Sequence, residues 1–284
     1  MKNVLVIPNT LKDADLSVTT RVIEKLTEFG MTALVSAEFS GKFGGKIEYF
    51  TSLPVSAELV LVIGGDGSVI DASRIAIELD IPLLGVNLGN LGYLSEVETD
   101  DLDILKKLAD GDYIVDDKML LEVSLGKSGK ITNAQRLAVN DIIISHSEYL
   151  GIADICLENS RSEAVKYRAD AVILATPAGS TAYALSSGGP IISHNLDSIT
   201  ATPVSPHSFF NRSIVYSANE ELKVSNIGRY SIKVSIDGRF FDSLENGDYC
   251  IVKKSDKRFK MLTFSENNMF TTLFNKLKIL SNIE

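Results

Sequence analysis

The amino-acid sequence predicts two domains: a doubly wound parallel α/β domain, followed by an all-β domain of the β-sandwich type. Over residues 1–116, buried-strand patterns alternate with helical patterns, which is the rhythm of a parallel sheet with crossover helices. Over residues 117–256, short strand patterns follow one another in series, separated by turn sequences such as ENGD. Residues 257–284 end in an apolar helical stripe, and we expect this segment to return to the first domain and pack on it.

The elements of the first domain follow from hydrophobic periodicity. Continuous apolar runs predict strands that are covered on both faces. Apolar residues spaced three or four positions apart predict helices, and Gly30 is a typical stop for the first of them. In chain order, we expect a strand at 3–8, a helix at 17–29, strands at 31–36 and 58–63, a helix at about 68–79, a strand at 81–86 and a helix at 100–111.

The second domain is predicted from short runs in which apolar and polar residues alternate, as Ile232, Val234 and Ile236 do. The candidate strands are MLLEVSLG, DIIISH, ADICLE, AVILAT, SIVYS, LKVS, SIKVSID and DYCIVKK. Ser265 is the expected N-cap of the terminal helix. The apolar stripe of that helix consists of Met269, Leu273, Leu277 and Leu280.

Composition narrows the class of protein. The chain has 284 residues, of which 45% are hydrophobic and 23% charged, as in soluble globular proteins. A net charge of −9 argues against nucleic acid or an anionic membrane as the main partner, although local amides can still bind small anions. Cys156, Cys250 and the three histidines show no metal-binding spacing, which favours free thiols and a cytoplasmic location. The chain has neither a bilayer-spanning run nor a signal-peptide pattern.

The strongest chemical signal is ELVLVIGGDGSVIDASR at 58–74, where an apolar strand leads through a glycine-rich turn into a helix. The turn consists of Gly64, Gly65, Asp66, Gly67 and Ser68. Glycines let the backbone approach a ligand, and the amides of a helix N-terminus favour phosphate. The segment matches neither a P-loop nor a dinucleotide fingerprint. Taken alone, it is also compatible with an ordinary turn in which Asp66 caps the helix.

Two polar positions stand beside other predicted strands. Asn87 directly follows the fourth strand, in GVNLGNLGYLSE, and is expected to order either the GGDGS turn or the ligand. Asn140 and Asp141 stand at the head of the strand NDIIISH. An amide beside a carboxylate can hold ribose hydroxyls or contact phosphates, although Asn-Asp is also common turn chemistry.

The segment YRADAVILATPAGSTAYALSSGGPI at 167–191 is the last signal. Pro177 and Gly179 shape a turn, and Ser180 can cap a short helix. The small residues leave room for the flat ring of a ligand. Tyr183 can stack on such a ring or form a hydrogen bond to it.

Together and in this order, these segments resemble the NAD kinase family, whereas GGDG alone is shared with phosphofructokinases and diacylglycerol kinases. The resemblance extends from about residue 58 to about residue 240 and includes VSPHSFFNRSIV and SIDGR. It implies transfer of the terminal phosphoryl group of ATP or polyphosphate to the adenosine 2′-hydroxyl of NAD. It also implies a divalent cation, expected to be Mg²⁺, and a homo-oligomer, either a tetramer or a dimer.

The resemblance assigns roles to individual residues. Asp66 matches the catalytic base that accepts the proton of the 2′-hydroxyl. Ala169, Ala171 and Arg239 depart from the family pattern, since the two alanines replace the glycines of R-G-D-G and Arg239 replaces a common glutamine. The expected NAD- and ATP-binding residues are Gly64, Gly65, Gly67, Ser68, Asn87, Asn140, Asp141, Arg168, Asp170, Thr181, Ala182, Tyr183 and Ser186.

Two other functions remain open at this point. A lipid kinase of the diacylglycerol or sphingosine type shares GGDG, but the TPAGSTAY and NLGNLGYL segments disfavour it. A non-catalytic dinucleotide sensor on the same fold is disfavoured by the intact Asp66.

Overall fold

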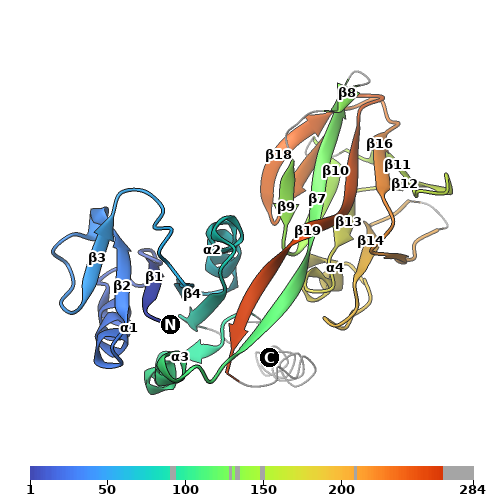
Figure 1. The fold of residues 1–284 in the computed structure, drawn as a ribbon. Coiled ribbons are helices and arrows are strands. Elements are labelled where there is room, and N and C mark those ends of the chain that lie inside the picture. Colours follow the sequence, from blue (N-terminus) through green and yellow to red (C-terminus); the bar gives the residue numbers. More distant parts are fainter. Residues whose placement is uncertain (90–93, 128–129, 132–134, 148–150, 208–209, 265–284) are drawn as a thin grey trace, which may run out of the picture. The chain divides into compact units, whose positions relative to one another are not determined.

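The chain forms two compact units in the computed structural model, which describes residues 1–89, 94–127, 130–131, 135–147, 151–207 and 210–264 (Figure 1). One unit consists of Met1–Asp117 and a segment that begins at Phe259, and the other is Lys118–Arg258. The chain passes between the units within β7 (Ile114–Lys127) and again within β19 (Tyr249–Thr263). Each unit has its own hydrophobic core.

The first unit contains the predicted parallel sheet, with strand order β3-β2-β1-β4-β5. The strands are β1 (Asn3–Pro8), β2 (Thr32–Ser36), β3 (Ile47–Phe50), β4 (Leu59–Gly64) and β5 (Leu83–Asn87). The short β6 (Val97–Glu98) pairs with β5, and Met261 of β19 also pairs with β5. Every residue of β4 is buried, which explains its unbroken apolar sequence. The strand β3 was not predicted, because no residue of IEYF is fully buried.

Helices connect these strands as expected of a doubly wound fold. They are α1 (Ser17–Glu28), α2 (Asp66–Leu79) and α3 (Lys106–Asp110), with the 3₁₀ turns η1 (Ala37–Phe39) and η2 (Leu102–Leu105). The predicted helix at 100–111 is therefore η2 followed by α3. The carboxylate of Asp13 accepts the amides of Val18 and Thr19 at 3.1 and 2.8 Å and so caps α1.

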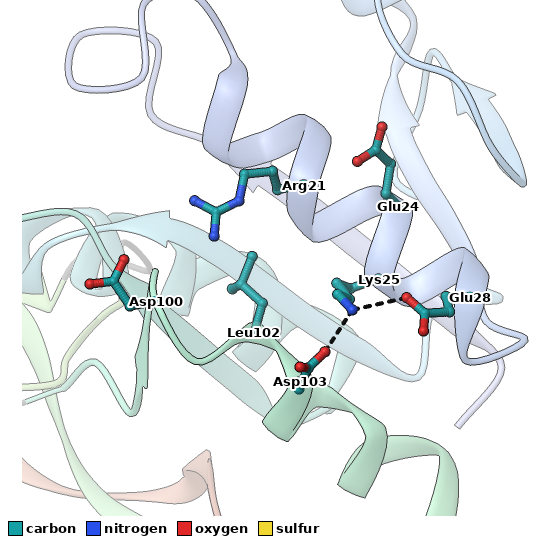
Figure 2. A pocket seen from close by; sticks show the side chains of 7 residues that line it. All are labelled: Arg21, Glu24, Lys25, Glu28, Asp100, Leu102 and Asp103. Atoms are coloured by element: carbon teal, nitrogen blue, oxygen red, sulfur yellow. Dashed lines mark hydrogen bonds and ion pairs between the residues drawn. The ribbon is translucent and has the colours of Figure 1, made fainter.

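A shallow polar surface lies between α1 and the chain around η2 (Figure 2). There, Lys25 pairs with Glu28 at 3.0 Å and with Asp103 at 2.6 Å. These side chains satisfy one another and hold the two elements together. We therefore interpret this surface as structural.

The strand order reverses between β1 and β4, since β2 and β3 follow on one side and β5 on the other. Open α/β sheets bind ligands in the crevice outside the carboxyl ends of the strands at such a reversal. The residues at that edge are those that follow Pro8 of β1 and Gly64 of β4. The fold therefore points to the GGDGS turn and to the turn after β1.

The second unit is a β-sandwich, as predicted. One sheet is antiparallel, with strand order β15-β14-β13-β10-β17-β18. Its strands are β10 (Asp141–His146), β13 (Ala171–Ala175), β14 (Ser198–Val204), β15 (Ile214–Ser217), β17 (Ile232–Ile236) and β18 (Arg239–Leu244). The other sheet contains β11 (Ala153–Glu158), β12 (Ala164–Ala169), β16 (Leu222–Asn226), β19 and β7, with the short β8 (Lys130–Ile131) and β9 (Arg136–Ala138) beside β7.

Alternation places the core of this unit between the two sheets. Ile142 and Ile144 of β10 pack in one cluster with Ile155 and Leu157 of β11. Ile143, which points to the opposite face of its sheet, packs with Ala184 of α4 (Tyr183–Ser186). The TPAGSTAY segment thus covers the outer face of the β10 sheet.

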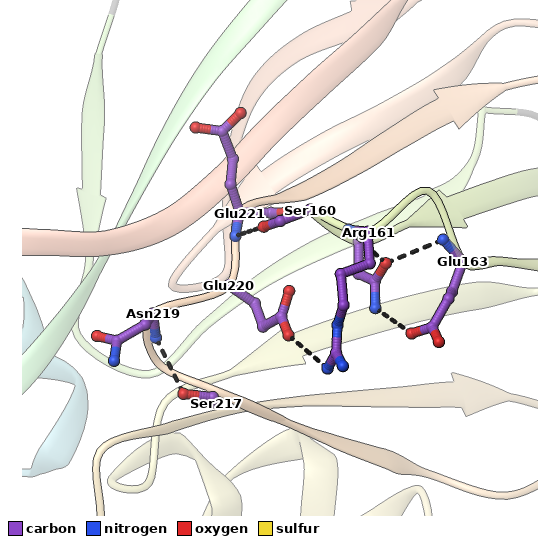
Figure 3. A network of polar contacts seen from close by, with 8 residues as sticks. Ser160, Arg161, Glu163, Ser217, Asn219, Glu220 and Glu221 are labelled. Atoms are coloured by element: carbon purple, nitrogen blue, oxygen red, sulfur yellow. Dashed lines mark hydrogen bonds and ion pairs between the residues drawn. The ribbon is translucent and has the colours of Figure 1, made fainter.

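Polar contacts tie two turns of the sandwich together (Figure 3). Arg161 donates to Glu220 at 3.3 Å, and the amide of Glu221 donates to Ser160 Oγ at 2.9 Å. These contacts join the β11–β12 turn to the chain that leads into β16. They are exposed or half-buried, and we interpret them as structural.

Several expectations concern features outside the candidate site. The predicted terminal helix with Ser265, Met269, Leu273, Leu277 and Leu280 lies outside the described residues. Cys156 and Cys250 are free thiols, as expected, and burial raises the pKa of Cys250 to about 12. Within the described parts of the chain, no helix is long and apolar enough to cross a membrane.

Candidate active site

The GGDGS turn joins β4 to α2 at the reversal of the sheet. The helix begins at Asp66, so Gly67 and Ser68 lie in its first turn. A Cβ atom on Gly64 would lie 2.3 Å from Ser68 Oγ, which explains why glycine is required there. Asp66 is half-buried, and its Oδ1 accepts the amide of Leu94 at 3.0 Å. The turn therefore combines helix-terminal amides, which favour phosphate, with one oriented carboxylate.

Asn9 and Lys12, in the turn after β1, belong to the same region and were missed in the sequence analysis. Asn9 Nδ2 donates to Ser68 Oγ at 2.8 Å, and Asn9 Oδ1 accepts the amides of Leu11 and Lys12 at 3.0 and 3.2 Å. Lys12 Nζ lies 3.2 Å from the position that a Cβ on Gly65 would occupy. The sequence does contain a signal for these two residues. They are polar and directly follow the first predicted parallel strand, and that strand lies next to the strand that ends in GGDGS.

Asn87 lies beside the GGDGS turn, since its β5 position pairs with Gly64 and the next amide, that of Leu88, donates to Gly64 O at 3.1 Å. Its side chain is buried and donates to Gly89 O at 3.2 Å and to the Glu98 carboxylate at 3.1 Å. Asn87 thus orders its own turn next to GGDGS.

A metal ion has limited protein ligands available. Among the residues that the structure describes, no group of three or more His, Cys, Asp or Glu side chains could hold a metal. Mg²⁺ does not need such a cage, because it is commonly bound by one or two carboxylates together with substrate phosphates. A Mg²⁺ ion carried by the donor phosphates fits the phosphate-favouring GGDGS turn.

Asn140 and Asp141 are held by Asp237, a residue that the sequence analysis did not assign to the site. Asp237 Oδ2 accepts the amide of Val139 at 2.9 Å, and Oδ1 accepts those of Asn140 and Asp141 at 2.8 and 3.1 Å. Asp237 has a φ of 48° and Gly238 a φ of 75° in the hairpin between β17 and β18. Asp-Gly is a common pair of residues in such a tight turn, so SIDGR could have been used to predict the hairpin from the sequence.

The TPAGSTAY segment is hydrogen-bonded to the turn that contains Val139 and Asn140. Asn140 O accepts the amide of Thr176 at 2.9 Å, and Thr176 Oγ1 donates to Val139 O at 2.7 Å. A Cβ on Gly179 would lie 2.0 Å from Asn140 O, so only glycine allows this approach. The structure therefore brings two of the predicted binding segments into direct contact.

The remaining predicted residues of this segment lie on its exposed side. Thr181 ends the 3₁₀ turn η3 (Gly179–Thr181), and its hydroxyl donates to Ala178 O at 3.1 Å. Ala182 is half-buried, while Tyr183 and Ser186, at the two ends of α4, are exposed. Tyr183 is 45% exposed, which leaves one side of its ring available to a ligand.

Asp170 lies just before β13, at the end of the β10–β13 pair that is remote from Asp141, and Arg168 lies two residues earlier in β12 of the other sheet. Asp141 pairs with Ala175 at one end of β10, whereas the amide of His146 donates to Asp170 O at 3.2 Å at the other end. At about 3.4 Å per residue, the five residue steps from Asp141 to His146 separate these ends by about 17 Å. Arg168 lines a cavity of about 300 Å³ together with His146, Asp154, Arg229 and Tyr230.

Ala169 and Ala171 introduce no backbone strain at this point. They lie in β12 and β13, and neither is among the described residues with positive φ. The conformational freedom of glycine is therefore not needed on either side of Asp170 in this chain.

The burial of Asp141 next to Asp237 can be tested by the pH dependence of the protein's stability. Burial, and then the nearby carboxylate of Asp237, raise the pKa of Asp141 from 3.8 to about 7. The folded chain therefore binds a proton that the unfolded chain has already released, so this residue's contribution to stability decreases as pH rises between these two values. We expect Asp141→Asn to abolish this decrease. Melting temperatures of both proteins at about pH 4 and about pH 8 measure it, and a pH-independent difference between them would contradict the assignment.

Comparisons with known proteins show the family to which the chain belongs. The sequence profile of the ATP-NAD kinase N-terminal domain matches residues 4–113, and that of the C-terminal domain matches residues 139–264. The NAD kinase of Lachnoclostridium phytofermentans is 33% identical over 285 residues, which covers 97% of this chain and 99% of that protein.

Solved structures show the same fold. Yeast NADH kinase in complex with NADH has a TM-score of 0.86 at 22% identity, covering 98% of this chain and 88% of the yeast chain. An NAD kinase from Archaeoglobus fulgidus in complex with ATP has a TM-score of 0.72 at 24% identity, covering 97% and 98%.

Fold and matches together define a phosphotransferase built from an α/β domain and a β-sandwich domain. The chain belongs to the ATP-NAD kinase family.

Proposed function

We propose that this chain phosphorylates the adenosine 2′-hydroxyl of NAD to make NADP, with ATP or polyphosphate as donor and Asp66 as general base. The observation that carries the proposal is the position of Asp66, at the carboxyl end of β4 and in the first turn of α2. Family membership supports the reaction itself, and it gives no support to a lipid kinase or a sensor.

The donor phosphates would bind at the GGDGS turn. Gly64, Gly65, Gly67 and Ser68 leave the backbone close to a bound phosphate chain, and the first amides of α2 point toward it. Bound Mg²⁺, held through the donor phosphates, would neutralise part of the charge on those phosphates.

The acceptor would bind at the sandwich. Asn140 and Asp141 would contact the ribose and phosphate region of NAD. The adenine and its ribose would be contacted by Thr181, Ala182, Tyr183 and Ser186. Asp170, about 17 Å from Asp141 along the strands, and Arg168 in the adjoining end of β12 would lie near the nicotinamide half. That separation suits the two halves of one extended dinucleotide.

The reaction itself is an in-line transfer. The 2′-oxygen of NAD forms a bond to the terminal phosphorus of the donor, while the bond from that phosphorus to the bridging oxygen breaks and ADP or shortened polyphosphate leaves. The proton of the hydroxyl passes to the carboxylate of Asp66. Positioning and charge neutralisation provide most of the catalysis in such transfers.

We also propose the wider organisation that the family resemblance implies. Residues 1–116 would carry the phosphate loop and residues 117–256 the NAD-binding segments, while 257–284 would return to the first domain. The protein would act in the cytoplasm as a homo-oligomer, either a dimer or a tetramer.

A donor panel tests the reaction. Purified protein is incubated with NAD, Mg²⁺ and either ATP, another triphosphate or polyphosphate, and NADP is measured with an NADP-specific dehydrogenase. NADP formed with at least one donor supports the proposal, whereas its absence with all donors would favour the sensor. Co-sedimentation with vesicles would be the sign of a lipid kinase.

Tyr183→Ala tests the acceptor site. If the exposed ring contacts the adenosine of NAD, its loss is expected to weaken NAD binding by on the order of 1–3 kcal/mol and to leave donor binding unchanged. Titrations of the folded variant with NAD and with ATP measure both. An unchanged NAD affinity would exclude Tyr183 from the site.

A further inference from the structure

We propose that Lys12 binds the phosphate chain of the donor and so determines the affinity for ATP at this site. This inference rests on the proposed function. Lys12 lies outside all the motifs that led to that function. Its side chain approaches the GGDGS turn from the end of β1, the strand next to β4.

The position of Lys12 is built by its own turn. Asn9 O accepts the amides of Lys12 and Asp13 at 3.1 and 2.8 Å, while the Asn9 side chain bonds both to the amide of Lys12 and to Ser68 Oγ. The turn is thus attached at one end to β1 and at its side to the first turn of α2. Such a turn presents the lysine in a set direction.

The ammonium group lies over the glycine loop. Lys12 Nζ is 3.2 Å from the position of a Cβ on Gly65, so a side chain there would displace it. It also donates to Leu88 O at 3.4 Å, which uses one of its three N–H donors. Gly65 therefore leaves room for this ammonium as well as for a ligand.

The location is the ligand crevice of the fold. Lys12 follows β1 and the GGDGS turn follows β4, and the strand order reverses between these two strands. Open α/β sheets bind ligands at this point. The lysine and the amides of α2 therefore face one region from two strands.

Charge supports a polyanionic ligand. The whole chain has a net charge of −9, so a triphosphate needs a local cation to approach. The carboxylate of the neighbouring Asp13 is turned toward the start of α1, where it accepts the amides of Val18 and Thr19. A lysine ammonium is a common partner of donor phosphates.

Lys12→Met tests the proposal, because it keeps the length of the side chain and removes the charge. We expect KM for ATP to rise about tenfold, the effect of one charge-assisted contact, while KM for NAD and kcat at saturating ATP change less than about threefold. Isothermal titration of the Mg·ATP complex should show the same loss. Lys12→Arg should restore most of the affinity.

Lys2→Met is the matched control, since it removes the same charge at the amino end of β1, the opposite edge of the sheet. It should leave KM for ATP unchanged. A folded Lys12→Met protein with wild-type affinity for Mg·ATP would overturn the proposal, as would equal losses of ATP and NAD affinity with a lowered melting temperature. If wild-type protein forms no NADP, the proposed function fails, and the titration still tests Lys12.

Discussion

Asp66→Asn is expected to lower kcat by roughly 10²–10⁴, the usual range for removal of a general base. The substitution preserves the contact seen in the structure, because an asparagine Oδ1 can still accept the amide of Leu94. It also preserves the helix start, since Asn and Asp are comparable near a helix N-terminus. NAD affinity and melting temperature should therefore change little, which would mark an interaction made chiefly in the transition state.

Other roles of Asp66 predict other results. A purely structural carboxylate predicts near-normal turnover in the variant, and a metal ligand predicts turnover that rises with Mg²⁺ concentration. Glu78→Gln removes the same charge from an exposed position of α2 and should leave kcat unchanged. A folded Asp66→Asn protein with more than about a tenth of wild-type kcat would count against the base assignment.

Gly179→Ala should weaken NAD binding at least about tenfold and destabilise the fold by about 1–3 kcal/mol, the usual cost of overpacking. The added Cβ would lie 2.0 Å from Asn140 O, which is backbone and cannot rotate away. The two segments proposed to bind the acceptor must then separate. Thermal melting and NAD titration of the variant measure both effects.

Gly44→Ala is the control for this substitution. Its added Cβ meets no atom within 4 Å, and its φ is not in the positive range. It should leave both stability and NAD affinity unchanged. A Gly179→Ala protein that behaves like Gly44→Ala would show that the contact between the segments can relax without consequence.

The sequence predicted the elements whose residues are uniformly buried or strictly alternating. The buried strand β4 and the alternating strand β17 were both found for this reason. The strands β12, β14 and β18 were missed. RFFDSL shows no alternation, and SITATPV contains Pro203 and small residues. In AVKYRA, Val165, Tyr167 and Ala169 do alternate with two exposed polar residues, so this strand was missed although its period is present.

The residues of the candidate site also differ in whether the sequence alone could identify them. Local motifs identified Asp66 and the TPAGSTAY segment, because their chemistry lies within a few consecutive residues. The contributions of Lys12 and Asp237 depend on pairing between distant strands, β1 with β4 and β10 with β17. Only the three-dimensional fold places such side chains beside residues more than fifty positions away.

The most direct test of the account is the ³¹P NMR spectrum of wild-type protein incubated with NAD, ATP and Mg²⁺, recorded beside the Asp66→Asn reaction. We expect a new phosphomonoester signal on the adenosine 2′-oxygen of NAD, with matching appearance of ADP. The signal should form in the wild-type reaction and be nearly absent in the variant over the same time. A phosphomonoester at any other position, no new signal, or equal signals from both proteins would contradict it.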